Sequence, residues 1–133
     1  MNKTDRTSSK PMKAATGLRH ILDATRFSIQ GIKATAKSEA AFRQELFIAA
    51  ILIPLSCILP VQSMNRILMI VSLLLILLVE LLNSALESIV DMVSPDYHEL
   101  AGKAKDCGSA AVMLSLFIAG VIWLLSLYQV FFS

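Results

Sequence analysis

The chain has 133 residues, of which 56% are hydrophobic and 17% charged, and its mean hydropathy is +0.68. A chain of this length forms one domain at most, and this composition is too apolar for an ordinary soluble core. The net charge of +2 is unevenly distributed, because residues 1–45 hold nine of the twelve Lys and Arg residues and only four acids. We therefore expect an all-α membrane protein whose N-terminus lies in the cytoplasm, following the positive-inside rule.

The N-terminal part of the chain predicts a disordered basic tail, residues 1–16, followed by an amphipathic interfacial helix, residues 17–37. In that helix, apolar side chains recur at offsets of three and four, and basic side chains follow about 100° further round. A third face carries small side chains, with Ser28 among them and Phe27 beside it. Small residues allow close approach of a flat ligand or simply of another helix, and the pattern leaves both open.

Three apolar segments predict transmembrane helices at about 40–61, 67–92 and 107–132, so that residues 17–133 form a single membrane domain. Pro54 lies inside the first of them, where we expect it to kink the helix without ending it. The segment 93–108 is the only sizeable loop after the first span, and we expect a short helix within it. Three helices would hardly shield polar groups alone, so we expect an oligomer.

The second apolar segment carries polar side chains on one face. The residues at offsets of 3, 4, 7 and 11 from Glu80 fall within an arc of roughly 100° on a helix. They are Asn83, Ser84, Glu87 and Asp91. An ionised carboxylate in hydrocarbon costs at least about 2.5 kcal/mol, so this face requires a compensating cation, proton or metal.

The acidic groups gather at the predicted cytoplasmic membrane surface. They are Glu39, Glu45, Glu80, Glu87, Asp91 and Asp106, with Lys105 beside them. Carboxylates at the membrane–water interface can bind Mg²⁺, which is held by one or two carboxylates together with substrate phosphates. Glu80 lies deeper in the membrane and could act as a general base. This arrangement is suited to phosphoryl transfer from a nucleotide to a lipid hydroxyl. Without any resemblance to a known family, however, the residues favour a non-catalytic subunit that conducts ions or uses its polar groups for assembly.

Two segments carry a specific resemblance. ELLNSALESIVDMVSPDYHELAGKAKDCGSAAV (80–112) and EAAFRQE (39–45) closely resemble the bacterial integral-membrane diacylglycerol kinase family, and the similarity covers about residues 17–133. The resemblance implies a surface helix and three spans, assembled as a homotrimer with active sites between subunits in the inner membrane. It also implies a magnesium-dependent, ATP-dependent kinase that converts 1,2-diacylglycerol to phosphatidic acid, and no nucleic-acid partner.

The same resemblance implies residue roles. Glu80 is the general base, and Glu39 and Glu87 hold Mg²⁺. The expected ATP-binding residues are Phe27, Ser28, Glu39, Glu87, Asp91, His98, Gly102, Lys105 and Asp106. The expected lipid-substrate residues are Gln44, Glu45, Asn83 and Ser109.

The chain departs from the family pattern in its surface helix. An ungapped comparison puts His20 where the family has an Arg, and Arg19 lies one position earlier. The tryptophans common in the surface helix of relatives are absent, since the only Trp is Trp123. Gram-positive members of the superfamily prefer undecaprenol, and an undecaprenol kinase is the alternative enzyme.

Overall fold

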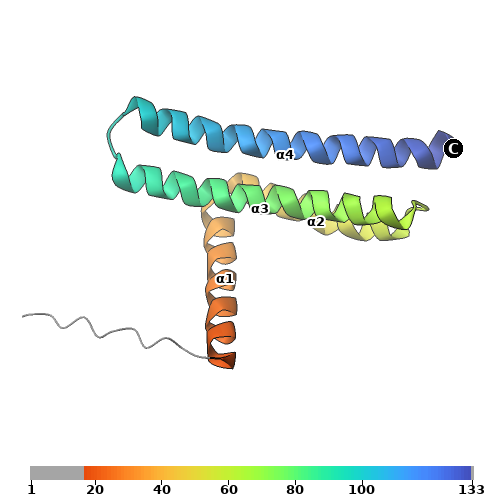
Figure 1. Ribbon diagram of the computed structural model, residues 1–133, viewed down its shortest axis with the longest axis horizontal. Helices are drawn as coiled ribbons and strands as arrows, with labels where there is room; N and C mark the ends of the chain where they lie inside the picture. Colours follow the sequence, from red (N-terminus) through yellow and green to blue (C-terminus); the bar gives the residue numbers. More distant parts are fainter. Residues whose placement is uncertain (1–16, 133) are drawn as a thin grey trace, which may run out of the picture. The chain divides into compact units, whose positions relative to one another are not determined.

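The computed structural model describes residues 17–132, which form four α-helices (Figure 1). The helices are α1 (Leu18–Ser38), α2 (Ala40–Ile58), α3 (Ser63–Val93) and α4 (Glu99–Phe132). The predicted all-helical architecture is therefore confirmed for these residues, whereas the predicted tail, residues 1–16, lies outside them. The described residues fall into two compact units, 17–31 and 32–132.

The first unit consists of Gly17 and the N-terminal part of α1. Gly17 has a φ angle of +83°, a left-handed conformation that glycine adopts without steric cost. Its carbonyl accepts a hydrogen bond from the backbone N–H of His20 at 3.0 Å. This turn begins α1, whose observed bounds lie within one residue of the predicted 17–37.

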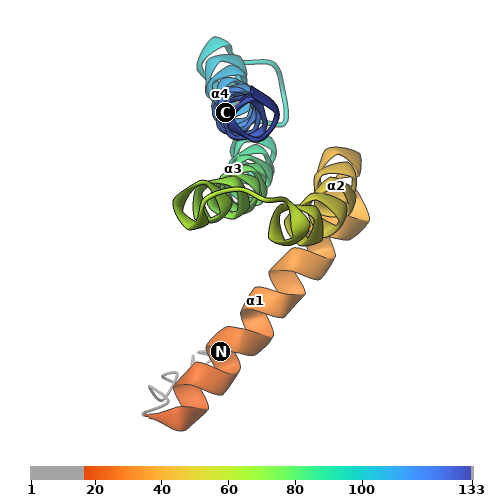
Figure 2. The same cartoon turned by 90° about the vertical axis from the view of Figure 1, so that its right-hand side faces the viewer.

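The second unit places α3 between α2 and α4, as two perpendicular views show (Figures 1 and 2). The core of the unit is formed by Ala49 of α2, Leu73 and Ile76 of α3, and Ala119 of α4, all less than a tenth exposed. The small side chains of Ala49 and Ala119 let the outer helices approach α3 closely. Helix α3 runs in the opposite direction to both α2 and α4, because short connections join them (Figure 1).

Helices α2, α3 and α4 are each long and apolar enough to cross a membrane. Helix α2 continues for four residues beyond Pro54, so this proline does not end the helix, as expected. The connection to α3 is held by Arg66, whose guanidinium donates hydrogen bonds to the carbonyls of Ser56 at 3.0 Å and Leu59 at 3.1 Å. Such bonds satisfy carbonyls that the end of a helix leaves without partners.

The loop between α3 and α4 is shorter than the sequence indicated. Helix α3 ends at Val93, just before Ser94 and Pro95, and α4 already begins at Glu99. The Nδ1 atom of His98 accepts a hydrogen bond from the backbone N–H of Leu100 at 3.2 Å and so caps the first turn of α4. Residues 99–106, expected as part of a loop with its own short helix, are instead the first two turns of α4.

Candidate functional site

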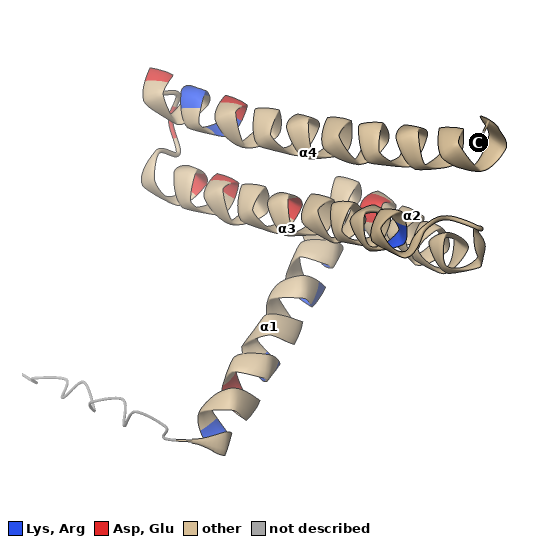
Figure 3. Ribbon diagram, turned by 45° about the vertical axis from the view of Figure 1, so that its right-hand side comes forward, with Lys and Arg blue, Asp and Glu red and all other residues tan. Residues whose placement is uncertain are grey.

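The polar face of α3 changes from buried to exposed along the helix. Glu80 is only 5% exposed and Ser84 is buried, whereas Asn83 and Glu87 are half-buried and Asp91 is exposed. The face therefore leads from the packed interior of the unit to its surface at the α3–α4 loop. In Figure 3, charged segments are concentrated where α3 and α4 join, while the C-terminal half of α4 carries none.

The buried end of this face meets two glutamates at the start of α2. Glu39 directly precedes α2, and its charge acts on Glu80, as does that of Glu87. Glu45 lies within electrostatic range of Glu80, and its Oε2 atom is buried with no hydrogen-bond partner among residues 17–132. The structure thus places three of the predicted carboxylates, Glu39, Glu45 and Glu87, within electrostatic range of Glu80, where their charges disfavour its ionised form unless a cation is present.

Helix lengths explain why these carboxylates meet. With 31 residues, α3 is longer than the 19-residue α2 by about three turns, or roughly 18 Å. Because α2 ends beside the start of α3, the first residues of α2 lie level with the middle of α3, near Glu80. The last turns of α3 project beyond α2 and pair with the first turns of α4.

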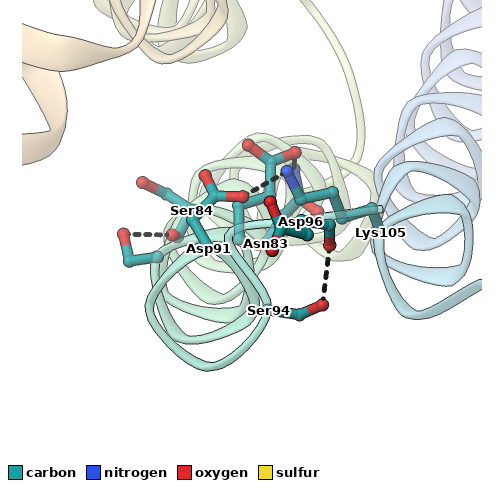
Figure 4. A network of polar contacts seen from close by, with 8 residues as sticks. Asn83, Ser84, Asp91, Ser94, Asp96 and Lys105 are labelled. Atoms are coloured by element: carbon teal, nitrogen blue, oxygen red, sulfur yellow. Dashed lines mark hydrogen bonds and ion pairs between the residues drawn. The ribbon is translucent and has the colours of Figure 1, made fainter. Parts of the chain in front are cut away.

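An ion pair joins these projecting turns. The Nζ atom of Lys105 lies 2.5 Å from Oδ1 of Asp91, and Lys105 is also within electrostatic range of Glu87 (Figure 4). Both partners line a pocket of about 190 Å³ at the loop. Its other walls include Ser94, Pro95, Asp96, Tyr97, His98, Ala101 and Gly102. Four predicted nucleotide residues therefore share one pocket: Asp91, His98, Gly102 and Lys105.

Asn83 connects the buried and exposed parts of the site. Its Nδ2 atom donates a hydrogen bond to Oε1 of Glu87 at 3.4 Å, one turn further along α3 (Figure 4). Its Oδ1 atom is buried and has no hydrogen-bond partner within the described part of the chain. On the facing helix, Gly108 is buried against this side chain. Gly108 was not among the residues expected at the site, although a glycine inside a helix can indicate close approach of a neighbour.

Other predicted site residues are not drawn into these clusters. Gln44 on α2 and Asp106 and Ser109 on α4 are exposed, and none of them lines the pocket at the loop. Phe27 and Ser28 belong to the first unit, and both are exposed there.

The donor set fits a hard divalent cation only if a substrate supplies further ligands. Among residues 17–132, no three His, Cys, Asp or Glu side chains converge as a metal-binding group. Mg²⁺, however, is commonly held by one or two carboxylates plus phosphate oxygens and water. Glu39 and Glu87, whose charges both act on Glu80, supply that number of carboxylates.

Comparison with known proteins gives consistent matches. The family model described as prokaryotic diacylglycerol kinase matches residues 26–127. A diacylglycerol kinase of Haemophilus influenzae is 49% identical over 112 residues, covering 84% of this chain and 95% of the relative. Those of Pseudomonas aeruginosa and Escherichia coli K12 are 47% and 41% identical over 116 residues, covering 87% of this chain and 94% and 95% of the relatives.

Proposed function

Because this chain belongs to the prokaryotic diacylglycerol kinase family, we propose that it transfers the γ-phosphoryl group of ATP to the hydroxyl of 1,2-diacylglycerol. The product is phosphatidic acid. The observation that carries this proposal is the family match over 26–127, which includes every carboxylate of the site. Family membership also makes the chain a kinase and a multi-pass membrane protein, so a non-catalytic ion-conducting subunit is no longer an alternative.

Glu80 is the proposed general base. It takes the proton of the lipid hydroxyl while that oxygen attacks the γ-phosphorus, and the bond from the γ-phosphorus to the bridging oxygen breaks to release ADP. Support comes from its position, since Glu80 is the buried carboxylate of the polar face, whereas Glu87 and Asp91 lie nearer its exposed end. A carboxylate sheltered from water, among other negative charges, is suited to accept a proton.

Glu39 and Glu87 are the proposed Mg²⁺ ligands, together with ATP phosphates. When bound there, the ion neutralises phosphate charge as it develops during transfer. The supporting observation is the gathering of Glu39, Glu80 and Glu87, whose mutual repulsion a divalent cation relieves. Glu39 and Glu87 carry oxygen ligands only, which are the ligands that Mg²⁺ prefers.

The pocket at the α3–α4 loop is the proposed nucleotide site, with Asp91, His98, Gly102 and Lys105 in its walls. The Lys105 ammonium supplies a positive charge for phosphate oxygens, and the ion pair with Asp91 fixes its direction. Asp106, which follows Lys105 on α4 and does not line the pocket, is a further proposed nucleotide contact, as the resemblance implies. The family resemblance also implies that Phe27 and Ser28 contact ATP, and we propose this role for them on that ground alone.

The lipid substrate approaches from the membrane side, where we place Gln44, Glu45, Asn83 and Ser109. A 19-residue helix such as α2 is about 28 Å long, close to the thickness of the hydrocarbon layer. Glu39 then lies at the hydrocarbon boundary. Glu80 lies at about the same height along the helices, within reach of a lipid hydroxyl. In this placement the N-terminus faces the cytoplasm of a bacterial inner membrane.

The functional assembly is a homotrimer in this proposal. Support comes from α2, α3 and α4, most of whose apolar side chains remain exposed within one chain. Some of that surface is expected to pack against neighbouring copies, because a small bundle leaves its polar face incompletely covered. Native mass spectrometry of the protein released from detergent micelles would give three copies, and a monomer as the active species would contradict the proposal.

The test of the proposed activity is label transfer from γ-labelled ATP and Mg²⁺ to lipid by purified protein in mixed micelles. Diacylglycerol and undecaprenol are offered in parallel. Label in phosphatidic acid is the expected result. Label mainly in undecaprenyl phosphate would reassign the substrate, and no label in either lipid from folded protein would contradict the proposal.

A further inference from the structure

Gly108 on α4 lies against the side chain of Asn83 on α3. A Cβ atom at position 108 would overlap with Oδ1 of Asn83, and it would lie 3.3 Å from Cγ of Asn83 and 3.7 Å from Cδ2 of Leu86. In the native chain this space holds only a glycine hydrogen, which points at the buried Oδ1 atom. We propose that Gly108 is a positioning residue for the phosphoryl-transfer site, because it sets the orientation of the Asn83 amide and thereby that of Glu87.

The planar amide of Asn83 transmits this effect. Its Oδ1 atom faces Gly108, while its Nδ2 atom donates the hydrogen bond to Oε1 of Glu87. The Cγ, Oδ1 and Nδ2 atoms of this planar group move together. If the amide rotates to avoid a methyl group at position 108, the direction of Nδ2 therefore changes as well. Glu87 then loses the donor that orients its carboxylate. A short side chain such as Asn has no flexible end that could yield instead.

Gly108 differs in this respect from the other glycines. An added Cβ at Gly17, Gly31, Gly102 or Gly120 would meet nothing within 4 Å. Gly120 lies on the same helix as Gly108 and is therefore a matched control. In both positions alanine is the better helix former, by about 1 kcal/mol, so a harmful effect confined to position 108 cannot come from lower helix propensity.

The inference rests on the proposed role of Glu87 in binding Mg²⁺ with ATP, and its test includes a readout that does not depend on that role. The side-chain amide resonances of Asn83 are followed by NMR in the wild type, Gly108→Ala and Gly120→Ala, and are assigned by their loss in Asn83→Ala. We expect them to shift in Gly108→Ala and to stay in place in Gly120→Ala. Unmoved resonances in Gly108→Ala would overturn the proposal, whatever the chain's activity.

The second readout is a double-mutant cycle on metal binding. Mn²⁺ in place of Mg²⁺ is titrated by electron paramagnetic resonance in the presence of the non-hydrolysable analogue β,γ-methylene-ATP. Gly108→Ala should weaken Mn²⁺ binding about tenfold in the wild-type background and not further in the Asn83→Ala background. Equal losses in both backgrounds would show that Gly108 does not act through Asn83 and would overturn the proposal.

The two proposals fail differently. Wild-type protein that transfers no phosphate to either lipid contradicts the proposed function, while the NMR comparison still decides the role of Gly108. Oligomeric state by native mass spectrometry should be the same for both glycine variants. A Gly108→Ala variant that loses its assembly as well as its metal affinity would show general packing damage and would overturn the positioning role.

Discussion

The Nζ atom of Lys105 and the Oδ1 atom of Asp91 lie 2.5 Å apart and join the first turns of α4 to the last turns of α3. The two side chains are 41% and 65% exposed, so their attraction is weakened by water and salt. The pair therefore contributes little to stability. It lines the pocket at the loop and holds a positive charge there.

Lys105→Met should consequently impair nucleotide binding far more than folding. We expect the KM for ATP to rise about tenfold or more because a charged contact to phosphate is lost. The free energy of unfolding should hardly change, because water and salt screen an exposed ion pair. Steady-state kinetics and unfolding in detergent measure the two effects. Lys103→Met, two residues earlier on the exposed surface of α4, is the control and should leave the KM for ATP unchanged.

Glu87→Gln should raise the Mg²⁺ concentration needed for half-maximal activity, because a neutral amide is a poorer ligand for a hard cation. We expect an increase of about tenfold, with the fold and the oligomeric state unchanged. Activity is measured across a Mg²⁺ titration at fixed ATP. The matched control is Glu99→Gln, which replaces an exposed acid in the first turn of α4. Overlapping titration curves for the wild type and Glu87→Gln would remove Glu87 from the metal site.

Arg66→Met should lower stability without affecting the chemistry. The Arg66 guanidinium donates hydrogen bonds to the carbonyls of Ser56, Leu59 and Val61, where α2 ends. The carboxylates Glu39 and Glu45 lie at the other end of α2. Loss of these charge-assisted bonds should cost about 1–3 kcal/mol. Reversible unfolding in mixed detergent micelles measures this cost. Gln62→Met, in the same connection, is the control, and an equal loss in both variants would contradict the capping role of Arg66.

The sequence predicted the helices well because their signals are local. The helices follow from apolar runs and from the pattern of the basic N-terminal region. The end of α3 follows from Ser94 and Pro95. Each of these signals depends on neighbouring residues only. The start of α4 was missed because charged residues 99–106 resemble a loop by composition. In the structure, His98 caps a helix that continues without a break through these residues. Composition does not record such a cap.

The site could be predicted in part for the same reason. The common face of Glu80, Asn83, Glu87 and Asp91 follows from helix periodicity alone. The approach of Glu39 and Glu45 to Glu80 depends on the different lengths of α2 and α3. The contact between Gly108 and Asn83 depends on the packing of α4 against α3, which no local pattern specifies. The assignment of roles to single residues came from the family resemblance.

The most direct test of the central claim is label transfer to diacylglycerol by Glu80→Gln, compared with Glu99→Gln in the same micelles. Gln preserves the shape of the buried side chain but cannot take the hydroxyl proton. We expect the rate to fall by at least about 10²-fold in Glu80→Gln, with the same oligomeric state and the same affinity for the ATP analogue. Glu99→Gln should keep the wild-type rate. Near-normal transfer by Glu80→Gln would show that another group is the base.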